Sequence, residues 1–125
     1  QIKDEKPEEL FRMSLIRAHF LESLAPLAGM RKSKDDLFML GLFSLMDIMT
    51  DTPMCDIVEL TQLSESISSP LVTNKGKSAD LLGIIKNYEQ GSWIKASNIA
   101  GKYGISSHEI LKVYLDSVEW ADDMF

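Results

Sequence analysis

The sequence predicts an all-α fold: a compact bundle of about seven helices around a central apolar helix. Two observations carry this prediction. Apolar residues recur at three- and four-residue steps along most of the chain, and no segment shows the sustained apolar–polar alternation of a β-hairpin. The 125 residues, 45% of them hydrophobic and 26% charged, are typical of one globular domain, so we expect a single all-α module over residues 1–125.

The first helix is expected to begin at Pro7, because proline suits the first helical position, where an N–H group would have no partner. Residues 1–6 are interpreted as a linker or flexible N-terminus. Arg17 stands within the apolar stripe of this helix, and Pro26 and Gly29 are expected to end it. The stripe consists of Leu10, Met13, Ile16, Phe20, Leu24 and Leu27.

A second helix is expected from Ser33, which forms a capping-box-like pattern with Asp36, to about Thr50. Positions 37–49 are apolar on nearly every side, which is typical of the buried centre of a bundle. Gly41 lowers helix propensity there by about 1 kcal/mol, so we expect it to permit the close approach of another helix.

Five further helices are expected, each marked by a proline, a capping residue or a following glycine. The clearest start is the capping box Ser106-x-x-Glu109. The expected ranges are 52–60, 64–72, 78–91, 93–104 and 106–120.

Charge and cysteine content narrow the functional classes. Thirteen basic against nineteen acidic residues leave a net charge of -6, which disfavours nucleic acid and anionic membranes as partners. The apolar run 37–49 is too short to cross a bilayer. Cys55 has no second cysteine to pair with, which favours a reducing, cytoplasmic location.

Three polar residues interrupt the apolar stripes: Arg17 in the first helix, and Ser44 and Asp47 in the second. A buried unpaired charge costs several kcal/mol, so an Arg17–Asp47 pair is the expected arrangement if both side chains face inward. We interpret this polar set as structural, because no second titratable partner is evident nearby.

Two alternative chemistries remain open. A residual metal-dependent phosphohydrolase would use His19, Glu22 and Asp47, although metal sites need clustered ligands and the chain has only two histidines. A helix-turn-helix DNA-binding adaptor would use residues 106–119. Three lysines against five carboxylates over residues 92–125 argue against that alternative.

Several segments together resemble the last part of HDOD domains, in particular those of bacterial proteins that join an EAL domain, of the cyclic di-GMP phosphodiesterase type, to an HDOD domain. The segments follow the same order over nearly the whole chain. They are Arg17-Ala18-His19-Phe20-Leu21-Glu22, Gly41-Leu42-Phe43-Ser44-Leu45-Met46-Asp47, Tyr88-Glu89-Gln90-Gly91-Ser92-Trp93 and Glu119-Trp120-Ala121-Asp122.

The resemblance implies an all-helical fold related to HD-type metal-dependent phosphohydrolases, whose central helix carries an adjacent His-Asp metal pair. Ser44 and Leu45 stand where that pair would be, so the resemblance implies no metal site and no catalysis. HDOD domains are longer than this chain, which suggests that preceding helices are missing.

The sequence therefore leads us to expect a non-catalytic regulatory or output module of a bacterial signalling protein, without a cofactor. The expected partner is an upstream EAL-type domain or another signalling protein, with a homodimer as the alternative. The expected anchors of such contacts are Phe20, Trp93, Tyr114 and Trp120.

Overall fold

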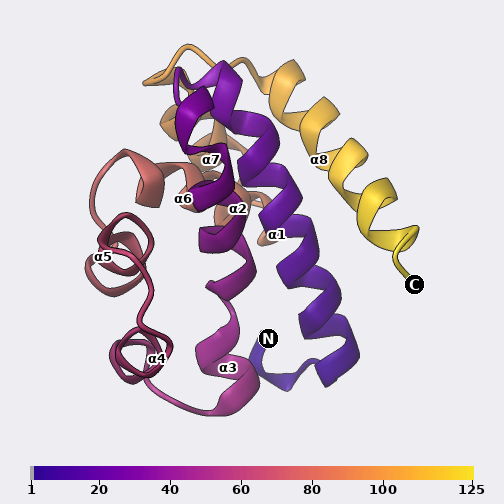
Figure 1. Cartoon of the computed structure of the whole chain (residues 1–125). Helices are drawn as coiled ribbons and strands as arrows, with labels where there is room; N and C mark the ends of the chain where they lie inside the picture. Colours follow the sequence, from indigo (N-terminus) through magenta and orange to yellow (C-terminus); the bar gives the residue numbers. More distant parts are fainter. Residues whose placement is uncertain (1) are drawn as a thin grey trace.

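The computed structural model describes residues 2–125, and this part of the chain consists of helices and turns with no strand (Figure 1). The all-α prediction is confirmed, and the seven expected helices are present, with the second divided in two. The elements are the 3₁₀ turn η1 (Ile2–Asp4), α1 (Pro7–Leu27), the 3₁₀ turn η2 (Arg31–Ser33), α2 (Lys34–Phe43), α3 (Met46–Thr50), α4 (Met54–Thr61), α5 (Glu65–Thr73), α6 (Lys77–Glu89), α7 (Trp93–Gly101) and α8 (Ser107–Asp122).

The N-terminal helix α1 begins at Pro7 as predicted. The expected linker 1–6 contains the turn η1, while Gln1 lies outside the described residues. Pro26 falls in the last turn of α1, which ends one residue later. The amide of Met30 then donates to the Ala25 carbonyl at 2.7 Å, and Gly29 adopts a φ of 72°. This left-handed glycine closes the helix in a Schellman arrangement.

The most enclosed helix is α1 and not the 33–50 segment that the sequence places at the centre. It packs against α2, α6 and α8, and ten of its residues are buried. In α2 three residues are buried and in α3 none, because several apolar side chains of these helices lie only half-buried at the edge of the core. Figure 1 shows α8 running beside α1 on one flank and α4 and α5 on the other side of α2.

The segment expected to be one helix from Ser33 to Thr50 is broken at Ser44 and Leu45. The Ser44 hydroxyl donates to the Gly41 carbonyl at 2.7 Å, and Leu45 has φ -112° and ψ 6°, outside the helical range. A serine hydroxyl bonded to its own helix backbone competes with the helical pattern. The expected Ser33 cap is also absent, since its side chain makes no capping bond and Asp36 instead accepts a hydrogen bond from Ser66.

The α1–α2 crossing depends on Gly41. A Cβ atom at this position would lie 2.6 Å from the backbone carbonyl carbon and oxygen of Arg17 and 2.7 Å from Cα of Ala18. Distances this short to backbone atoms cannot be relieved by a side-chain rotation. The close approach expected from the sequence is confirmed, and it involves α1.

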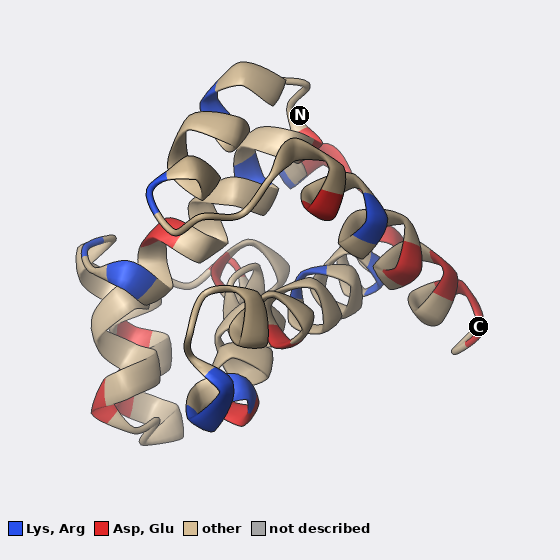
Figure 2. Ribbon diagram, turned by 90° about the horizontal axis from the view of Figure 1, so that it is seen from above, with Lys and Arg blue, Asp and Glu red and all other residues tan. Residues whose placement is uncertain are grey.

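The C-terminal pair of helices follows the sequence signals closely. The Ser106 hydroxyl accepts from the Glu109 amide, and the Glu109 carboxylate accepts from the Ser106 amide, so the predicted capping box is confirmed. Figure 2 shows basic and acidic positions distributed over several helices of the bundle. No single helix among residues 2–125 is long and apolar enough to cross a membrane.

Replacing Gly41 by alanine is expected to lower the free energy of unfolding by about 1–3 kcal/mol or more, because α1 and α2 must separate to admit a methyl group. Gly83→Ala in α6 is the matched control. Its added Cβ would lie 3.5 Å from Cδ1 of Ile99, an ordinary contact, so helix propensity should raise stability by up to about 1 kcal/mol. Urea denaturation of both variants checks the pair, and equal effects would contradict this account of the crossing.

Candidate functional site

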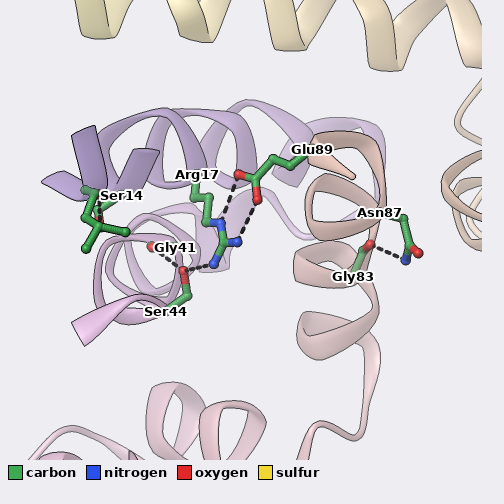
Figure 3. Close-up of polar contacts among 8 residues, drawn as sticks. Ser14, Arg17, Gly41, Ser44, Gly83, Asn87 and Glu89 are labelled. Atoms are coloured by element: carbon green, nitrogen blue, oxygen red, sulfur yellow. Dashed lines mark hydrogen bonds and ion pairs between the residues drawn. The ribbon is translucent and has the colours of Figure 1, made fainter. Parts of the chain in front are cut away.

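A buried ion pair joins α1 to the end of α6. The Arg17 side chain, 2% exposed, donates from Nη2 to Oε1 of Glu89 at 2.6 Å and from Nε to Oε2 at 3.0 Å. Its Nη1 donates to the Ser44 hydroxyl at 3.1 Å (Figure 3). The guanidinium is thus bonded to both carboxylate oxygens and to the residue at which the α2–α3 segment breaks. Two parallel hydrogen bonds from one guanidinium are the strong form of this interaction.

The expected Arg17–Asp47 pair is wrong, although Ser44 does bond to Arg17 as a member of the expected polar set. The carboxylate partner is Glu89, 72 residues away in sequence. Asp47 lies beyond the break, where its Oδ1 accepts from the backbone N–H of Ile48 at 2.9 Å. The sequence contained one signal for Glu89: it follows Leu82 and Ile85 at helical spacing and so continues the buried face of α6.

The residues of the alternative metal site are not brought together. No group of three or more His, Cys, Asp and Glu side chains within residues 2–125 is arranged to hold a metal ion. His19 faces α8, where its ring stacks on Trp120 with centroids 4.8 Å apart. Asp47 lines a cavity with Lys86 instead.

A contact with α8 determines which ring nitrogen of neutral His19 carries the hydrogen. Its Nδ1 lies 2.8 Å from the Ser117 hydroxyl oxygen, and that hydroxyl donates its only hydrogen to the Val113 carbonyl at 2.7 Å. Ser117 must therefore accept from Nδ1–H, which fixes the neutral tautomer. Burial lowers the pKa of His19, while the nearby carboxylates of Glu22 and Asp116 partly oppose this shift.

The four expected anchors lie in different environments. Phe20 is 0% exposed and belongs to the core, so its expected role as a contact residue is corrected. Trp120 is half-buried between His19 and Phe38, and Tyr114 is half-buried against Tyr88. Trp93 is 57% exposed. Sequence periodicity marks all four as apolar positions, but only the packing distinguishes core from surface.

An apolar groove lies between α7 and α8, with a volume of about 340 Å³. Trp93 and Ile94 form one side, and Ile110 and Leu111 the other. Tyr88 lines it too, with its ring edge-on to Trp93 at 4.7 Å between centroids. Ile94 is 78% exposed and Leu115, one turn beyond Leu111, is 56% exposed. Grooves of other proteins that bind an amphipathic helix are likewise lined by apolar side chains.

The helix-turn-helix alternative uses the same two helices. Its first turn in α8 presents Ser107, His108 and Glu109, and the one lysine further along, Lys112, bonds to Asp116 at 3.1 Å. A lysine paired to a carboxylate on its own helix is less free to contact phosphate. DNA binding by residues 106–119 stays a prediction of the helix-turn-helix alternative that nothing in the structure tests.

Removing one member of the buried pair should be costly. We expect Arg17→Met or Glu89→Gln to lower the free energy of unfolding by about 3–5 kcal/mol, because the partner then stays buried without its bonds. The double variant Arg17→Met with Glu89→Leu should lose much less than the sum of the single effects. Arg12→Met is the control, since the partly exposed Arg12–Asp122 pair is worth only about 0–1 kcal/mol. Additive effects in urea denaturation would contradict the assigned coupling.

His19 should make stability depend on pH. Because its folded-state pKa lies below the ordinary 6.5, the unfolded chain binds a proton at higher pH than the folded chain. Above 6.5 the site contributes no pH dependence, and as the pH falls from 6.5 through the lowered folded-state pKa the stability drops. His19→Gln should remove this slope and exposed His108→Gln should keep it, as measured by urea denaturation across the pH range. Parallel curves for wild type and His19→Gln would argue against the assignment.

Comparisons with known proteins give two distant relatives. No family model matches the chain, and no solved structure matches it. The chain is 24% identical over 123 residues to "Cyclic di-GMP phosphodiesterase CdgJ" of Vibrio cholerae, a match that covers 98% of this chain and 28% of that protein. It is 25% identical over 116 residues to "Uncharacterized protein YuxH" of Bacillus subtilis, covering 93% of this chain and 28% of that protein. The chain therefore spans less than a third of either relative, while the similarity extends over nearly the whole helical bundle.

Proposed function

We propose that this chain is a catalytically silent, HDOD-like regulatory module of a bacterial signalling protein connected with cyclic di-GMP. It would act through contacts between its helices and an EAL-type domain. The observation that carries the proposal is the environment of Ser44 and Leu45, the positions at which the resemblance to HD-type enzymes expects a His-Asp metal pair. Ser44 accepts a hydrogen bond from Arg17 and donates one to Gly41, and the Leu45 side chain is 2% exposed.

Ser44 and Leu45 contribute to the packing of the bundle. The Ser44 hydroxyl has one hydrogen, already donated to Gly41, and its oxygen faces the positive charge of Arg17. A guanidinium beside a prospective metal ligand repels a divalent cation. Both features support a scaffold role for the segment in which the related enzymes hold their metal.

The comparisons support the signalling context. The chain resembles CdgJ, whose name assigns to that protein a cyclic di-GMP phosphodiesterase activity, and most of CdgJ lies outside the matched region. A module that accompanies such an enzyme can influence it by packing against it. In the proposal, the EAL-type domain is the partner of this chain.

The α7–α8 groove is the surface we assign to this contact. Trp93, Ile94 and Leu111 bring exposed apolar area from two helices together, and tryptophan is among the residues enriched in interface hot spots. The bundle would relay a change in packing at this groove to the attached domain.

Two surface substitutions test the proposed contact: Ile94→Asp and Leu111→Asp, made in the full-length protein with its EAL-type domain. We expect cyclic di-GMP hydrolysis to change by about five-fold or more, because a charge in the groove opposes docking. Leu60→Asp is the control, since Leu60 is 79% exposed and lies in α4, away from the groove. Unchanged hydrolysis in both groove variants would contradict the assigned surface.

The same purified protein distinguishes the alternative functions. Stoichiometric manganese, iron or zinc in the isolated chain, together with phosphodiester hydrolysis lost in His19→Ala, would establish the phosphohydrolase instead. A salt-sensitive complex with duplex DNA would establish the adaptor. The proposed function requires neither result.

A further inference from the structure

A second cavity, of about 250 Å³, lies where the α2–α3 break, the end of α5 and the middle of α6 meet. Its wall carries the polar side chains of Ser44, Asp47, Asn74 and Lys86, together with apolar side chains such as Met54 and Leu82. The volume is below the roughly 300–1,000 Å³ of pockets for drug-sized ligands. The cavity therefore suits a molecule of a few heavy atoms.

Lys86 brings a positive charge to this cavity without a partner. Among residues 2–125 no hydrogen bond or ion pair involves its ammonium group, although the side chain is half-buried. Burial lowers the pKa of Lys86, and the positive charge of Arg17 lowers it further, while Asp47 and Glu89 act in the opposite direction. A half-buried ammonium gains from an anionic group supplied by a ligand.

Asp47 brings the opposite charge to the same cavity. One of its oxygens, Oδ1, accepts from the Ile48 amide, and no ion pair in the described residues involves its carboxylate. Glu89 is bonded to Arg17 through both of its oxygens, and no ion pair in the described residues joins it to Lys86. The cavity wall is thus left with one positive and one negative group that attract but do not touch.

We propose that this cavity binds a small zwitterion: an amine–carboxylate molecule with a short apolar body, such as a free aliphatic amino acid. The carboxylate of the ligand meets Lys86, with the Asn74 amide as a further donor. The ammonium group meets Asp47, and the aliphatic part lies on the side of Met54 and Leu82. Inorganic phosphate or a simple carboxylate satisfies Lys86 but faces the charge of Asp47.

Ser44 connects the cavity to the buried ion pair. Its side chain lines the cavity and accepts the hydrogen bond from Arg17, so a bound ligand lies one residue away from the α1–α6 connection. The inference rests on the cavity alone and does not depend on the proposed function.

Calorimetric titration of the whole chain tests the charge pattern of the ligand. L-Alanine and L-valine are the zwitterions, propionate and propylamine each carry one of the two charges, and inorganic phosphate is the anion control. We expect saturable binding of the amino acids, with affinity at least about ten-fold lower for each single-charge analogue, since one ion contact is lost. Equal binding of propionate or phosphate would overturn the proposal in favour of a simple anion site.

Substitutions locate the binding. Lys86→Met and Asp47→Asn should each lower the affinity for L-valine by about ten-fold or more, whereas exposed Lys95→Met and Asp123→Asn should leave it unchanged. Amide resonances of the unsubstituted chain provide a measurement that needs no variant. Those of Asp47, Asn74 and Lys86 should move on addition of L-valine. Absence of shifts at millimolar amino acid would show that the cavity holds only solvent between the two charges.

Discussion

The rest of the structure depends on Arg17, because this one residue fixes three helices at once. Its backbone lies against Gly41 of α2 so closely that no Cβ atom fits between them. Its guanidinium bonds to both carboxylate oxygens of Glu89 at the end of α6 and to Ser44 at the break after α2. A charge this well buried is costly in the absence of such bonds, so the relative positions of α1, α2 and α6 are coupled.

The break between α2 and α3 follows from the same constraint. In a continuous helix, Leu45 and Asp47 would follow Ser44 around the same helix axis. The observed turn instead buries Leu45 and leaves Asp47 half-buried beside a cavity. The chain turns at Ser44, whose hydroxyl donates to the Gly41 carbonyl and accepts from Arg17. The turn between α2 and α3 is therefore tied to the buried cation of Arg17.

Local signals predicted the parts of this fold that local interactions determine. Pro7 begins α1, Ser106 and Glu109 cap α8, and Gly41 permits a close crossing, each for a reason that a short stretch of sequence contains. The break at Ser44 and the partner of Arg17 could not be derived in that way. The break involves a contact between residues 17 and 44, and the ion pair one between residues 17 and 89, for which Asp47 was an equally charged candidate. Phe20 and Trp93 likewise share apolar character, and only tertiary packing makes the first buried and the second exposed.

The last turn of α6 connects the three sites of the molecule. Lys86 faces the cavity, Tyr88 lies in the wall of the α7–α8 groove, and Glu89 holds Arg17. These residues stand within four positions of one rigid helix, so a displacement of that turn changes all three environments together. The regulatory role that we propose would need such a connection between surfaces, and helical packing can supply it. The buried ion pair therefore lies on the same helical turn as residues of the cavity and of the groove.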